Sequence, residues 1–90
     1  MKEMEIQYVV TYHPEIGKPV TCKVMDGTEL ANLYGFSDCS GAIIKKVWEV
    51  NKDGNLERVL LRENRRPPYN WLCIQNMENM KVDMYTWNEH

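Results

Sequence analysis

The chain has 90 residues, of which 43% are hydrophobic and 27% charged, with a formal net charge of −2 at pH 7. This composition is too apolar for a disordered chain, and the length predicts one domain, residues 1–90, around one modest core. So short a chain has little room for a deep catalytic cleft beside that core, so we expect no enzyme. The mild acidity gives no overall attraction to nucleic acid or to an anionic membrane.

The cysteines indicate the compartment. Cys22, Cys39 and Cys73 are an odd, widely spaced set without a C-x-x-C pair, which argues against a disulfide framework. No apolar run approaches the length of a membrane span, and no secretory segment follows Met1. We therefore expect a cytoplasmic protein with free thiols and no membrane association. Cys22 and Cys73 lie among apolar residues and are predicted to be core side chains.

The first predicted element is a β-hairpin. Residues 3–13 alternate between apolar and polar side chains, as a half-buried strand does. One face of this strand carries the apolar set Met4, Ile6, Tyr8, Val10 and Tyr12. Turn-forming residues 14–19 lead into a second alternating run at 20–25.

A short helix is predicted to follow Asp26. Asp26 can cap the first turn while Glu29 reaches back to the cap. Gly35 is placed to end the helix in a left-handed conformation. Two or three turns are not stable alone, so the helix should pack on the sheet. Its apolar stripe has helical spacing: Leu30, Leu33 and Tyr34.

Residues 37–41 are predicted as a loop before a second hairpin. Its strands are expected at 42–50 and 55–63, with Gly54 left-handed in the turn. A three-residue loop would set Glu49 opposite Glu57, an unfavourable pair of like charges. A four-residue loop would separate them, so the register at 51–55 stays open. The three-residue register would also place one apolar set on a single face: Ile44, Trp48, Val50, Leu56 and Leu60.

The last segment admits two interpretations. After Pro67-Pro68, which break the chain, residues 71–87 form either a third hairpin turning at 78–79 or a strand and then a helix from Asn76. The aromatic and β-branched residues favour the hairpin. One hairpin face would then hold Trp71, Cys73, Val82 and Met84, and the other Leu72, Ile74, Tyr85 and Trp87. The predicted fold is α+β, with an antiparallel sheet of hairpins in the order β-β-α-β-β-β-β packed on one short helix.

Both faces of this last hairpin would be apolar. One face can line the core. The other needs the helix as a cover, or it forms an interface such as a homodimer through the C-terminal segment.

A basic and aromatic segment is the most distinctive feature for function. Residues 45–66 carry seven basic and four acidic side chains. Arginine and flat aromatic rings suit an acidic protein surface, and they also suit phosphates and bases. The plain interpretation is a solvated strand end followed by core aromatics. The residues predicted to contact a partner are Arg58, Arg62, Arg65, Arg66, Tyr69 and Trp71, with Trp48 nearby.

Other chemistry finds little support. Zinc sites use closely spaced pairs of ligands, and no two of His13 and the three cysteines lie within four residues. Cys39 lacks a recognised nucleophile motif, although His13 is one candidate base. No cofactor or metal is predicted.

The layout, rather than any motif, resembles the compact one-helix α+β proteins that phages and other mobile elements encode, often as inhibitors of host machinery. That resemblance implies a non-enzymatic protein-binding module, an inhibitor or adaptor of a larger host protein. The alternative is a small nucleic-acid-binding regulator that uses residues 58–71 and Lys45-Lys46.

Overall fold

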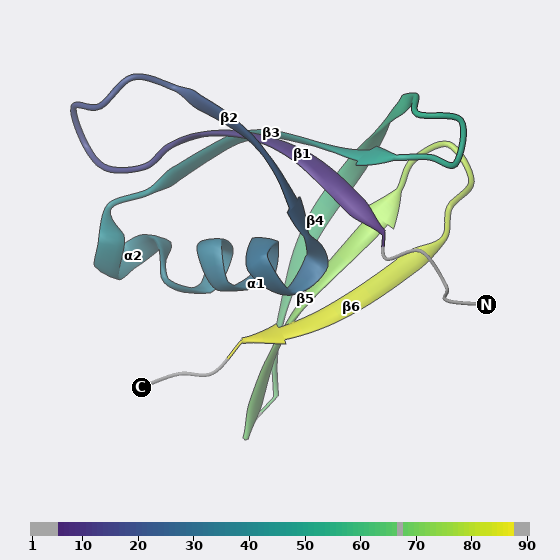
Figure 1. Ribbon diagram of the computed structural model, residues 1–90. Helices are drawn as coiled ribbons and strands as arrows, with labels where there is room; N and C mark the ends of the chain where they lie inside the picture. Colours follow the sequence, from purple (N-terminus) through teal and green to yellow (C-terminus); the bar gives the residue numbers. More distant parts are fainter. Residues whose placement is uncertain (1–5, 67, 88–90) are drawn as a thin grey trace.

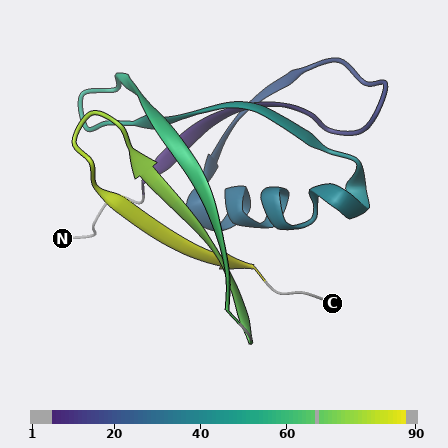
Figure 2. The same cartoon turned by 180° about the vertical axis from the view of Figure 1, so that it is seen from behind.

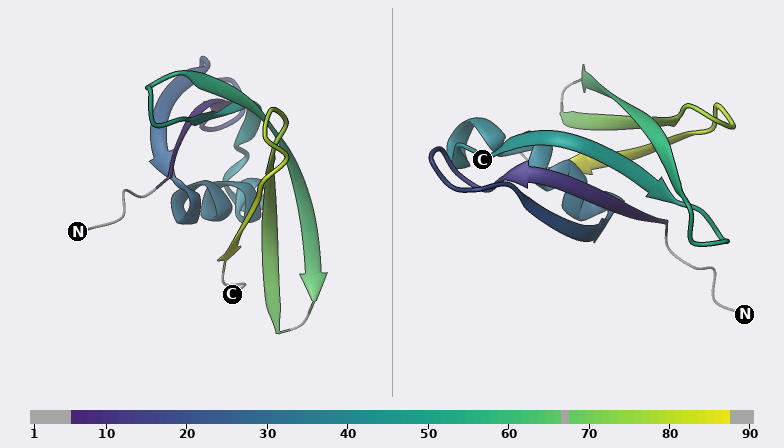
Figure 3. Two further views of the ribbon diagram at one scale, coloured as in Figure 1. Left: turned by 90° about the vertical axis from the view of Figure 1, so that its right-hand side faces the viewer. Right: turned by 90° about the horizontal axis from the view of Figure 1, so that it is seen from above.

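The computed structural model describes residues 6–66 and 68–87. Six antiparallel strands form a curled sheet, and one short helix lies in its hollow (Figures 1 and 3). The strand order is β2-β1-β3-β4-β5-β6, which confirms the predicted α+β class. Met4 and Pro67 lie outside the described residues. The elements are β1 (Gln7–His13), β2 (Thr21–Asp26), α1 (Gly27–Gly35), α2 (Ser37–Ser40), β3 (Ile43–Val50), β4 (Leu56–Arg66), β5 (Tyr69–Asn76) and β6 (Val82–Trp87).

The core fills the space between the inner face of the sheet and α1. As the alternation predicts, Tyr8 and Val10 of β1 point inward and are fully buried. α1 lies mainly against β6 at the far edge of the sheet. The helix thereby bridges the two ends of the curled sheet. The buried core set is Tyr8, Val10, Met25, Leu30, Ala31, Leu72, Ile74 and Trp87.

The start of α1 follows the predicted cap. The Asp26 side chain accepts a hydrogen bond from the Glu29 backbone N–H at 2.8 Å. The Glu29 carboxylate, instead of reaching back to the cap, lies 3.6 Å from the Lys23 ammonium. The first turn is therefore stabilised by one side-chain cap and an exposed ion pair of small energetic value.

Removing this cap should destabilise the fold modestly. We expect Asp26→Ala to lower the free energy of unfolding by about 1 kcal/mol, because one N–H of the first turn loses its acceptor. Asp26→Asn keeps an acceptor and should retain most of the stability. Urea titration of the three proteins measures both effects. Equal losses for alanine and asparagine would assign the effect to the charge instead of the cap.

The end of α1 differs from the prediction. Gly35 is not left-handed; the chain continues through Phe36 into α2, and Gly41 ends that turn with φ 77°. The predicted loop at 37–41 is therefore mostly a helical turn. Gly35 serves close packing, because a Cβ there would clash with the Trp87 ring.

The β3–β4 turn adopts the three-residue register. Trp48 pairs with Arg58, so Glu49 stands opposite Glu57. The Asn51 side chain explains the choice, because its Oδ1 accepts from the N–H groups of Asp53 and Asn55, both at 2.9 Å. Gly54 is left-handed, with φ 84°, as predicted.

An irregularity in the β1–β3 pairing moves Ile44 to the inner face. Thr11 pairs with Lys46 but Tyr12 with Ile44, so one residue of β3 is skipped. Ile44 therefore packs against the core, and the prediction that it shares a face with Trp48 is wrong.

The C-terminal half forms the predicted hairpins. β4 runs on to Arg66, three residues past the predicted end, and β5 pairs with β6 throughout. The alternative helix from Asn76 is wrong. Buried Asn76 organises the turn, its Oδ1 accepting from the N–H groups of Glu78 and Asn79 at 2.8 and 3.1 Å. α1 covers the inner face of this hairpin.

The cysteine predictions for the core are wrong. Cys22 is exposed on the edge strand β2, and Cys73 is half-buried on the outer face of β5. All three thiols are free.

Candidate functional site

Charge is segregated between the two faces of strands β3 to β6. Their four acidic residues all point to the inner side, as the register with core residues shows. Most of their basic residues lie on the outer face instead. An anionic partner would therefore meet positive charge without a competing carboxylate on that face. The inner acids are Glu49, Glu57, Glu63 and Asp83; the outer basic residues are Lys46, Arg58, Arg62 and Arg66.

The outer face is also apolar. Five aliphatic or thioether side chains on it are between 41% and 53% exposed. They come from β2, β4 and β6 and lie on the same face as half-buried Trp48 of β3 and Trp71 of β5. No described element covers this face (Figure 3). The five side chains are Val24, Leu56, Leu60, Val82 and Met84.

The structure brings five of the six predicted contact residues to this outer face. Arg62 stands opposite Cys73 and Arg66 opposite Tyr69. Arg58 lies near the start of β4 and pairs with Trp48. The rings of Tyr69 and Trp71 meet edge to face, with centroids 6.4 Å apart. Arg65 is separated from this group, because it points to the inner side of β4 and pairs with Glu63.

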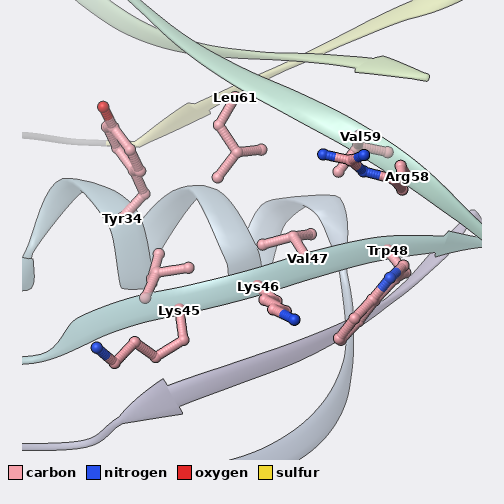
Figure 4. Close-up of a pocket in the computed structure, with 9 residues that line it drawn as sticks. Tyr34, Lys45, Lys46, Val47, Trp48, Arg58, Val59 and Leu61 are labelled. Atoms are coloured by element: carbon pink, nitrogen blue, oxygen red, sulfur yellow. The ribbon is translucent and has the colours of Figure 1, made fainter. Parts of the chain in front are cut away.

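A cleft of about 650 Å³ opens between β3 and β4. The two strands meet at the 51–55 turn and then diverge (Figure 2). Figure 4 shows Val47 and Leu61 pointing toward each other from the two strands, with Tyr34 rising from the helix behind them. The cleft therefore has an apolar floor. Its other lining residues are Ile44, Lys45, Lys46, Trp48, Arg58 and Val59.

Sequence reasoning identified the rim of this cleft but missed the floor. Lys45-Lys46, Trp48 and Arg58 stand out as basic and aromatic residues. Val47 and Leu61 have the ordinary alternation of core strands, and nothing local shows that their strands separate. The divergence of β3 from β4 is a property of the whole sheet.

Three polar atoms from β1, β3 and β6 are buried on the inner face of the sheet. The Tyr8 hydroxyl, Glu49 Oε1 and Asp83 Oδ2 are buried without a hydrogen-bond partner in the described part of the chain. Burial raises the pKa of Glu49, and the charges of Asp83 and Glu57 raise it further, against the lowering effects of Asn76 and Lys81. Burial likewise raises the pKa of the Tyr8 hydroxyl, with Tyr85, Asp83 and Glu49 adding to the effect. The surroundings of Tyr8 and Glu49 therefore disfavour the ionised forms of both side chains.

The other sequence candidates lie apart from these features. His13 Nδ1 donates a hydrogen bond to the Lys18 carbonyl at 2.7 Å, within the β1–β2 connection. Cys39 is exposed on α2. Within residues 6–66 and 68–87, no three His, Cys, Asp or Glu side chains are grouped so that they could hold a metal ion.

Neither described helix is long and apolar enough to cross a membrane. Comparisons with protein-family models, with curated proteins and with solved structures find no match for this chain.

Proposed function

We propose that this chain is a non-enzymatic protein-binding module, an inhibitor or adaptor that contacts an acidic surface of a larger partner through the outer face of its sheet. The observation that supports this proposal is the charge segregation of β3 to β6. A fold that only needed solubility would have no reason to keep acids off its exposed face.

The composition of the outer face agrees with this role. Arginine and tryptophan are the residues that contribute most often to binding energy at protein interfaces. Exposed aliphatic side chains from three strands on one face of a sheet are unusual on a protein with no partner. An inhibitor of the kind that mobile elements encode needs only such a surface, with no cofactor or catalytic group.

A second copy of the chain is a weaker candidate for the partner. A face-to-face homodimer would bring the β4 arginines of two copies together, with no acidic residue of β3 to β6 on that face to offset them. Like charges at such an interface oppose association. The predicted homodimer through the C-terminal segment is therefore not our proposal.

Nucleic acid is the second candidate function. Lys45, Lys46 and Arg58 surround the cleft together with Trp48, a combination that suits phosphates and a stacked base. The net charge of −2 opposes it. Binding to nucleic acid would fall steeply with salt, whereas an interface with a large apolar part would change less.

Charge reversal on β4 tests the protein-binding proposal. We expect the native partner, captured from host extract and then purified, to form a stoichiometric complex that Arg62→Glu with Arg66→Glu weakens roughly 100-fold or more. The matched control is Lys18→Glu with Lys52→Glu, two exposed lysines that lie in connecting turns and not in β4. Calorimetry measures the affinities, and circular dichroism checks folding. Equal affinities for both double variants would exclude the outer face of β4 as the site.

A further inference from the structure

β4 has an open edge inside the sheet. The strand spans Leu56–Arg66, yet in the described residues its ladder with β3 joins only Leu56–Arg58 to Trp48–Val50. Beyond Arg58, β3 turns away (Figures 1 and 2), and residues 59–66 pair with β5 on the other side alone. A strand edge of this length is a template for another strand.

The turn geometry shows which backbone groups point into the cleft. Asn51 N–H donates to the Asn55 carbonyl at 2.9 Å, and the pairs of an antiparallel ladder alternate from there. Odd-numbered residues of β4 therefore direct their N–H and C=O groups toward the β3 side. Even-numbered residues should direct theirs toward β5, and the carbonyl of Arg58 does so, because it accepts from Met77 N–H at 2.8 Å. Val59, Leu61 and Glu63 thus present backbone donors and acceptors to the cleft.

The side chains around this edge define what could pair with it. Even-numbered Arg62 and Arg66 lie on the outer face, four residues apart, and Lys45 and Lys46 extend from the facing strand (Figure 4). Odd-numbered Leu61 points into the apolar floor. A complementary strand would carry acidic residues on one side and apolar residues on the other, in strict alternation.

We propose that the cleft between β3 and β4 binds an extended, acidic segment of the partner protein, which adds to the open edge of β4 as a new antiparallel or parallel strand. This proposal rests on the proposed function and specifies how the partner is held. The added strand would place acidic side chains opposite Arg62 and Arg66. Its apolar side chains would cover Leu61 and Val47.

Hydrogen exchange with a model peptide tests the strand addition. The probe is a blocked peptide of about eight residues that alternates Glu and Val, long enough to span the open edge. At saturation we expect the amides of Val59, Leu61 and Glu63 to exchange roughly tenfold or more slowly, because they become hydrogen-bonded. The amides of Leu60 and Arg62, which face β5, should not change. A peptide that alternates Lys and Val is the charge control and should not bind.

A backbone variant tests the same point independently. Glu63→Pro removes a donor that faces the cleft and leaves the β5 side intact, so it should abolish peptide binding, whereas Glu63→Ala should retain it. If Glu63→Pro does not fold, the exchange measurement on the natural chain still decides.

The outcomes separate this proposal from the proposed function. If the Glu–Val peptide binds without slowing exchange of the odd-numbered amides, strand addition is wrong and contact through the face survives. If it does not bind although the native partner still requires Arg62 and Arg66, strand addition is again wrong and the protein-binding function stands. If single-stranded DNA binds in the cleft, the peptide does not, and no protein partner requires Arg62 and Arg66, both proposals are overturned.

Discussion

Alanine at Gly27 is expected to cost about 3 kcal/mol of stability, or to prevent folding, although alanine is the better helix former by about 1 kcal/mol. A Cβ at Gly27 would clash with Cζ of Tyr85, at the tip of the ring. That ring has little room to move, because it packs edge to face on fully buried Tyr8, with centroids 6.2 Å apart. Chemical denaturation of the variant measures the loss.

A shorter side chain at position 85 should relieve the clash. Tyr85→Leu alone will cost stability through lost packing, but Gly27→Ala added to it should cost little, so the two changes should couple strongly in a double-mutant cycle. Thr28→Ala, an exposed neighbour in the same helix, is the matched control and should be nearly neutral. Gly27→Ala with the stability of the natural chain would mean that α1 does not approach β6 so closely.

The two helix glycines show where local sequence rules stop. Asp26 as the cap and the stripe of Leu30 follow from spacing alone, and both are confirmed. Gly35 has the right place for a left-handed cap, yet its reason is the Trp87 ring from a strand over fifty residues later. No local pattern distinguishes a glycine needed for backbone conformation from one needed for close approach.

The strand faces show the same limit in the sheet. Alternation predicts the inner set of β1 and both faces of the β5–β6 hairpin, because side chains alternate along a strand whichever strand it pairs with. It failed for Ile44, where the β1–β3 irregularity reverses the face. Alternation also leaves the 51–55 register open, because it does not reveal the Asn51 side chain, whose Oδ1 accepts from the Asp53 and Asn55 N–H groups and fixes the turn despite the like-charge pair.

The sequence predicts which residue types make up the candidate site, but not how the fold arranges them in space. Arginines at even positions of β4 share a face once the strand is recognised, which separates Arg65 from Arg62 and Arg66. The segregation of acids needs the faces of four strands at once, and the cleft needs the angle between β3 and β4. Both depend on the curl of the sheet around α1, a long-range property.

Glutamine at Glu49 is expected to stabilise the protein at neutral pH, by on the order of 1–2 kcal/mol. The Glu49 side chain is buried opposite Glu57 and near Asp83, with Oε1 unpaired in the described residues. An ionised carboxylate there lacks the solvation it has in the unfolded chain. Glutamine has nearly the same shape, carries no charge, and brings donors toward the unpaired Asp83 oxygen.

The sign of the pH dependence distinguishes this cause from packing. The folded-state pKa of Glu49 is raised above the ordinary 4.5, so its protonated form is favoured by folding. Below the ordinary value both states are protonated and the penalty is absent. As pH rises from there through the folded-state pKa, the natural chain loses stability that Glu49→Gln keeps. The stability difference, measured by urea unfolding between about pH 4 and 8, should therefore grow with pH.

Glu57→Gln is the matched control, because its carboxylate lies directly across the ladder in a different environment. The hydrogen bond that Asn76 Nδ2 donates to Glu57 Oε1 lowers the pKa of Glu57, so its ionised form is favoured by folding. Removing that charge should cost stability that is fully present above the ordinary pKa of 4.5 and disappears as pH falls through the lower folded-state pKa, the opposite sign to Glu49→Gln. Two variants with the same slope would show that net charge, and not the burial of Glu49, controls the pH dependence. Opposite slopes would establish that burial opposes the charge of Glu49 while hydrogen bonding favours the charge of Glu57 in the same ladder pair.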